Sequence, residues 1–133
     1  MREELARHEG HEVDTAGDGF LTTFATPSQA VRCATRLHRV MADIGLQLRV
    51  GIHCGEVEVR ARSIAGISVH IAARTQAKAN PGETLVTSTA RQAMTGADVA
   101  FVDRGRHTLK GVAGRWALYA IAPPVDRSAR TER

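Results

Sequence analysis

A single carboxylate lies at the centre of a glycine-flanked tripeptide, Gly17-Asp18-Gly19, near the start of the chain. The residues on both sides favour β-strands, and Asp-Gly between two such runs is a strong hairpin signal, because Gly adopts the positive φ that hairpin turns need. A carboxylate at the tip of a hairpin can face a divalent metal ion. Taken alone, the tripeptide is more often a plain turn, because short motifs occur frequently by chance.

A second candidate for chemistry is the pair His70 and Arg74. The apolar pattern from Val69 to Lys78 predicts a helix, and residues four apart lie on the same side of a helix. Both side chains can therefore face one ligand, and a planar guanidinium suits a phosphate over which negative charge spreads. An isolated Arg on a helix is more often a surface residue, so the pair needs further support.

Length and composition limit the class of protein. A chain of 133 residues with 43% hydrophobic and 4% aromatic residues predicts one compact α/β or α+β domain. The charge of +4 is spread along the chain without basic blocks between aromatic residues, so we expect no nucleic-acid partner. Cys33 and Cys54 lack metal spacing, and no apolar run approaches the roughly 20 residues that span a bilayer. We therefore expect a cytoplasmic chain without direct membrane contact.

Strands and helices alternate along the predicted domain, residues 1–122. The pattern predicts strands at about 11–16 and 19–25, a helix from Thr26-Pro27 to Gly45, strands at 46–52 and around 57–59, a loop at 61–66, a helix at 69–78, a strand at 84–86, a short helix capped by Ser88 or Thr89, a strand at 100–102, and a hairpin of 107–109 with 116–121. Residues 123–133 are polar and basic and predict a disordered tail.

The order of these motifs resembles the catalytic domain of class III nucleotidyl cyclases, especially the actinobacterial members. The motifs are the Asp18 turn between strands, the run Gly51-Ile52-His53-Cys54-Gly55-Glu56-Val57, the helix with Val69-His70-Ile71-Ala72-Ala73-Arg74, and the final Leu109-Lys110-Gly111-Val112-Ala113-Gly114-Arg115-Trp116. They cover the chain from Glu4 to about Ile121. Because several ordered motifs match together, chance is a poor explanation.

The resemblance implies a ferredoxin-like α+β sandwich, with an antiparallel-rich sheet and helices on one face. It also implies two chains that pair head to tail, as a homodimer or a heterodimer with a related cyclase chain. The reaction would convert ATP or GTP to a 3′,5′-cyclic monophosphate and pyrophosphate, with Mg²⁺ or Mn²⁺ as the cofactor.

Residue by residue, the resemblance gives Asp18 a metal-binding role and Arg74 a phosphate contact in the transition state. His70 stands where the family usually has a ribose-orienting Asn, and Lys110 lies where the family directs a lysine toward the triphosphate. Asp14 and Ser63 occupy the base-selecting positions. We expect ATP ahead of GTP, although Asp14 is closer to the Glu of guanine-selective members, which leaves the purine open.

The family's first strand, with its first metal-binding Asp, has no counterpart in this sequence. Asp18 alone would leave two clustered cations short of ligands. Three interpretations follow: a cyclase domain of doubtful activity, a non-catalytic nucleotide-binding or dimerisation partner of a complete cyclase chain, and a ferredoxin-like regulatory domain. The Arg74 motif argues against the third.

Overall fold

The computed structural model describes residues 10–14, 21–55, 58–60, 63–94 and 99–122. The helices and strands in these ranges are β1 (His11–Asp14), β2 (Leu21–Thr23), α2 (Pro27–Ala42), β3 (Arg49–Ile52), β4 (Glu58–Arg60), β5 (Ser63–Ala65), α3 (Ile67–Lys78), β6 (Glu83–Thr87), α4 (Ser88–Ala93), β7 (Phe101–Thr108) and β8 (Arg115–Ile121). The turn that carries Asp18 and the predicted tail lie outside these ranges.

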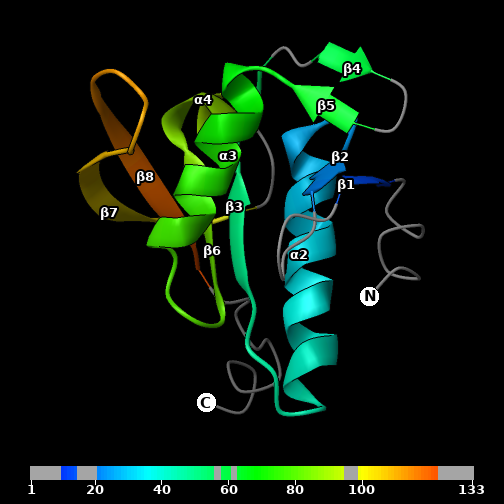
Figure 1. The fold of residues 1–133 in the computed structure, drawn as a ribbon. Helices are drawn as coiled ribbons and strands as arrows, with labels where there is room; N and C mark the ends of the chain where they lie inside the picture. The colour runs from blue at the N-terminus through cyan, green and yellow to red at the C-terminus, as the bar shows by residue number, and fades with distance from the viewer. Residues whose placement is uncertain (1–9, 15–20, 56–57, 61–62, 95–98, 123–133) are drawn as a thin grey trace.

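Four strands form the central sheet, in the order β3-β6-β8-β7 (Figure 1). β3 runs parallel to β6, and the β6–β8 and β8–β7 pairs are antiparallel. Two antiparallel hairpins, β1–β2 and β4–β5, form separate two-stranded sheets. The described strands therefore make an antiparallel-rich arrangement with one parallel crossover through α3.

Helix α2 begins where its sequence predicts. Thr26 caps the helix by accepting a hydrogen bond from the backbone N–H of Gln29, whose side chain bonds back to the Thr26 N–H, and Pro27 follows at the first helical position. Its apolar side packs with α4 against one face of the sheet, which we call the α2 face. The buried residues of this cluster are Val31, Ala34, Ile52, Val86, Ala90 and Met94.

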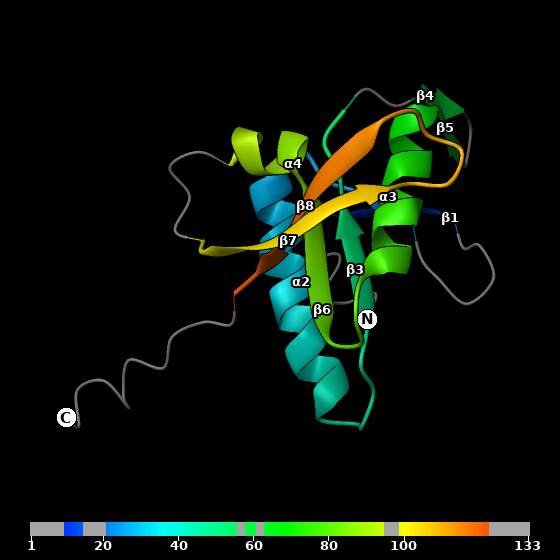
Figure 2. The same ribbon diagram turned by 90° about the vertical axis from the view of Figure 1, so that its left-hand side faces the viewer.

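Helix α3 covers the opposite face of the sheet, which we call the α3 face (Figure 2). Its close approach to β3 depends on Gly51, because a Cβ there would lie only 2.7 Å from the Ala72 carbonyl oxygen and would collide with the Gln76 backbone. Gln76 also donates a side-chain hydrogen bond to the Arg49 carbonyl. The helix that carries His70 and Arg74 is thus held directly on the backbone of the sheet.

The α+β class and the antiparallel-rich sheet are confirmed, but the expectation of helices on one face is wrong. Alternate residues of β6 show why: Val86 packs with α2 and α4, whereas Leu85 packs with Ala79, directly after α3. Both sides of this strand are apolar, so both need a covering helix.

Three local predictions also need correction. The strand expected at 100–102 and the one at 107–109 are a single strand, β7, which continues through a bulge between Asp103 and Arg106. The loop expected at 61–66 contains β5, which pairs with β4. The short helix α4 is capped by Thr87, whose hydroxyl accepts from the Ala90 N–H, rather than by Ser88 or Thr89.

Candidate functional site

The predicted helix for His70 and Arg74 is confirmed as α3, which begins at Ile67 after Gly66. Gly66 has a φ of +120°, a conformation that side chains rarely adopt. The start of the helix also lies close to the end of β3, because a Cβ on Gly55 would lie 3.3 Å from Cβ of Ser68. Two glycines therefore set the entry of α3 beside the sheet.

His70 contacts the turn between β7 and β8. Its Nε2 lies 2.9 Å from the Lys110 carbonyl oxygen, which accepts the hydrogen bond. The next residue, Gly111, has a φ of +81°, and a Cβ at this position would lie 2.8 Å from the same nitrogen. The structure thus brings two of the predicted site residues together through the imidazole of one and the backbone of the other.

Arg74 lies one helical turn after His70 and is half-buried. Within the described ranges, its guanidinium forms no hydrogen bond or ion pair, whereas Arg104 on β7 is paired with Glu83. Its N–H groups are therefore not taken up by another described side chain. Five donors in a planar fork fit the oxygens of a phosphate group.

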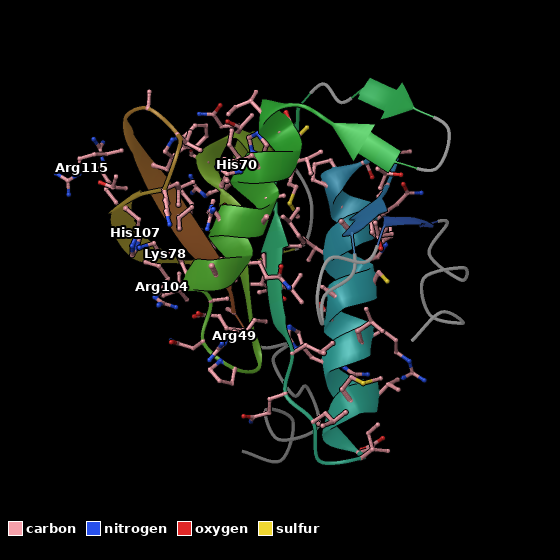
Figure 3. The ribbon with its side chains drawn as sticks, in the orientation of Figure 1. Arg49, His70, Lys78, Arg104, His107 and Arg115 are labelled. Carbon is pink, nitrogen blue, oxygen red and sulfur yellow. The ribbon has the colours of Figure 1, made fainter. Side chains whose placement is uncertain are left out.

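Arginine, lysine and histidine side chains gather on the α3 side of the sheet. Figure 3 shows them from α3 across to the β7–β8 hairpin, and the labelled residues are Arg49, His70, Lys78, Arg104, His107 and Arg115. The positive charges of α3 and of the hairpin thus share one side of the domain, where their fields add.

The two predicted base-selecting residues lie on neighbouring strands. Asp14 ends β1, opposite Leu21 of β2, and Ser63 begins β5, opposite Arg60 of β4. β1 contacts β5, and β5 contacts α3. Backbone contacts therefore connect both positions to the helix of Arg74, while the side chains of Asp14 and Ser63, and the whole of Asp18, lie outside what the structure describes.

Contacts among His53, Thr87 and Trp116 support the site from beneath, and the sequence does not reveal them. The imidazole of His53 lies 2.8 Å from the Thr87 hydroxyl and meets the ring of Trp116 edge-on at 5.8 Å, and burial lowers its pKa. Trp116 donates from its indole N–H to the Ala113 carbonyl in the β7–β8 turn. The alternation of β8 could have indicated an inward Trp116, but no local pattern pairs it with His53.

The described residues do not form a metal site. They contain no group of three or more His, Cys, Asp or Glu side chains arranged to hold an ion. A hard divalent cation needs several oxygen ligands. The described residues therefore do not fit a metal, and the metal-binding prediction rests on Asp18 through the family motif.

Comparisons with known proteins agree with this geometry. Residues 1–123 match the family model for the adenylate and guanylate cyclase catalytic domain. A candidate adenylate cyclase of Rhizobium meliloti (strain 1021) is 33% identical over 114 residues, covering 79% of this chain and 19% of the relative. A Mycobacterium tuberculosis protein of unassigned function is also 33% identical over 114 residues, covering 82% of this chain and 39% of that protein.

A solved structure of a cyclase also matches this fold. The adenylate/guanylate cyclase/hydrolase from Silicibacter pomeroyi superimposes with a TM-score of 0.82 at 27% identity, covering 93% of this chain and 79% of the other. The chain therefore belongs to the adenylate/guanylate cyclase catalytic-domain family, class III. It spans about a fifth of the Rhizobium relative and about two fifths of the mycobacterial one. Within the described ranges, no helix is long and apolar enough to cross a membrane.

Proposed function

We propose that this chain provides one half of a two-chain nucleotidyl cyclase site, which converts ATP, ahead of GTP, to the 3′,5′-cyclic monophosphate and pyrophosphate. The observation that carries the proposal is that α3 and the β7–β8 turn lie on the same side of the domain. His70, four residues before Arg74 on α3, donates a hydrogen bond to the Lys110 carbonyl in this turn. Guanidinium and ammonium groups on one side of a domain suit a triphosphate.

In this reaction the 3′-oxygen of the ribose bonds to the α-phosphorus, and the proton of the 3′-hydroxyl passes to water. The bond from the α-phosphorus to the bridging oxygen breaks, and pyrophosphate departs with the electron pair. Arg74 would donate N–H groups to the α-phosphate as charge spreads over its oxygens, and Lys110 would neutralise charge on the departing pyrophosphate. Asp14 and Ser63 would contact the purine, which makes them the residues that choose between ATP and GTP.

The second candidate function is a non-catalytic partner that gives Arg74 to the site of a complete cyclase chain. The favouring observation is that Arg74 forms no hydrogen bond or ion pair with another described side chain, so it is available to the site of a second chain. The two candidates differ in one measurable respect. The chain alone should cyclise nucleotide slowly or not at all if it only donates Arg74.

The test measures cyclic-nucleotide production by the protein alone and by its mixture with a complete related chain whose transition-state Arg has been removed. We expect the mixture to recover turnover, and Arg74→Ala to lower that recovery by a factor on the order of 10³. Arg32→Ala on the exposed side of α2 is the matched control and should leave it unchanged. A folded heterodimer without recovered turnover would contradict both candidates.

A separate experiment concerns Asp18 and the metal. If the carboxylate keeps the metal role that the family motif implies, Mg²⁺ or Mn²⁺ should tighten nucleotide binding to the wild-type protein. Calorimetric titration with and without metal measures the difference, which Asp18→Ala should abolish and Asp43→Ala should preserve. If the metal dependence survives in Asp18→Ala, Asp18 does not bind the metal and serves only as a turn residue.

A further inference from the structure

The turn between β7 and β8 is held at several points along its length. Leu109, which precedes it, is 1% exposed, and its carbonyl accepts a hydrogen bond from the Val112 N–H at 2.9 Å. The Trp116 indole N–H holds the Ala113 carbonyl at 3.2 Å. The peptide between Lys110 and Gly111 is held by a side chain from a different element, α3.

That side chain is His70, and the contact determines which of its two ring nitrogens carries the hydrogen. A carbonyl oxygen only accepts, so Nε2 of His70 must carry the hydrogen that bonds the Lys110 carbonyl at 2.9 Å. The neutral ring is therefore the Nε2–H tautomer. The imidazole lies so close to the turn that a Cβ on Gly111 would be 2.8 Å from Nε2, so a side chain at position 111 would push the ring out of this contact.

We propose that His70 is a positioning residue: its Nε2–H fixes the Lys110–Gly111 peptide and thereby sets the region that the Lys110 ammonium can reach, instead of the ring binding the ribose. The ammonium forms no ion pair within the described ranges, and Lys110 is exposed on a flexible stem, so the position of its backbone limits where the ammonium can go. The effect on ligand binding rests on the proposed function, whereas the bond between His70 and the turn does not.

Two substitutions separate positioning from ribose binding. The side-chain amide of Gln can place an N–H close to where Nε2 of histidine lies, whereas Asn is one methylene shorter and can only approach the position of Nδ1. His70→Gln should therefore keep the turn in place, and His70→Asn should release it. If His70 instead orients the ribose, His70→Asn should be the tolerated change, because Asn is the residue that the family uses there.

The first readout is hydrogen exchange at the Val112 amide, which is bonded inside the turn. Loss of one net hydrogen bond should raise its exchange about two- to tenfold in His70→Ala and His70→Asn, and His70→Gln should match the wild type. Unchanged exchange in His70→Ala, or protection by Asn but not by Gln, would overturn the inference. This readout requires no ligand and no activity.

The glycines of the turn provide a matched second test. Gly111 and Gly114 have similar φ values, +81° and +86°, but a Cβ on Gly114 meets nothing within 4 Å. Gly111→Ala and Gly114→Ala therefore add similar backbone strain, and only the first collides with His70. Gly111→Ala should have the lower melting temperature, and this difference should vanish when both are made in His70→Ala. A difference that persists in that background would contradict the contact.

The last readout is the affinity for inorganic triphosphate. His70→Ala and Lys110→Ala should each weaken binding, and the double variant should be no weaker than Lys110→Ala alone, because His70 acts through Lys110. Additive losses would show that His70 does not act through Lys110 and would overturn the inference. If the wild-type protein does not bind triphosphate, the proposed function fails and the exchange comparison decides this inference by itself.

Discussion

The two faces of the central sheet are covered in different ways. On the α2 face, side chains from α2, α4 and the strands interlock in an apolar cluster that includes Val31, Val86 and Met94. On the α3 face, the helix reaches the backbone of β3 at Gly51, and the apolar cluster is smaller. The difference indicates that the α2 face supplies stability, while the α3 face fixes the position of Arg74 and the β7–β8 turn.

The largest expected effect on stability is on the α2 face. Met94 is 3% exposed, and Met94→Ala should lower the free energy of unfolding by about 2–5 kcal/mol, because a cavity remains in the cluster. Chemical denaturation measures this loss. The affinity of the remaining folded protein for triphosphate should not change, and a large drop in affinity would contradict the division between the two faces.

Gly51→Ala should have a smaller effect on stability than Met94→Ala, but it should also lower the affinity for triphosphate. Overpacking against α3 should cost about 1–3 kcal/mol and move the helix, so triphosphate affinity should also fall. Gly105→Ala is the control, because its φ of +84° adds strain of about 1–2 kcal/mol in open space. Equal affinities for the two variants would show that α3 tolerates displacement from β3.

Each face also contains a histidine bonded to a threonine of β6. His38 pairs with Thr84 on the α2 face at 2.7 Å, His53 pairs with Thr87 on the α3 face at 2.8 Å, and burial lowers the pKa of both imidazoles below 6.5. The unfolded chain therefore takes up protons first as the pH falls. Stability from these groups is present above about pH 6.5 and is lost as the pH falls from there to the folded pKa values.

Denaturation series between about pH 7 and pH 5 measure this slope. The double variant His38→Gln/His53→Gln should flatten it, because neither site then titrates. His107→Gln is the control, because this imidazole bonds a backbone carbonyl of its own strand, that of Arg104, and the substitution should leave the slope as in the wild type. A slope that survives in the double variant would show that other groups govern this pH range.

Features encoded by neighbouring residues could be predicted from the sequence. The start of α2 follows from Thr26 and Pro27, and the helical spacing of His70 and Arg74 follows from the pattern around them. The strand limits of β7 could not be predicted in this way. A bulge at Gly105 interrupts the alternation, and only pairing with β8 restores one continuous strand.

Long-range contacts explain the other differences between the sequence prediction and the structure. Thr87 caps α4 because β6 delivers its hydroxyl to the Ala90 N–H, although Ser88 and Thr89 are equally good capping residues by type. Likewise, nothing near His70 in the sequence reveals that its imidazole meets the carbonyl of Lys110, 40 residues later. The family motif predicted the candidate site residues, and the fold shows that two of them, His70 and Lys110, touch.

The bulge in β7 has a consequence for how copies of this domain meet. β7 is an outer strand of the four-stranded sheet, and a regular outer strand is a template for unwanted pairing with another chain. Gly105 interrupts the regular strand at its middle, and the exposed Arg106 next to it carries positive charge, whereas Arg104 is paired with Glu83. Two such edges repel each other and match poorly, so this side of the sheet is protected against aggregation by strand addition.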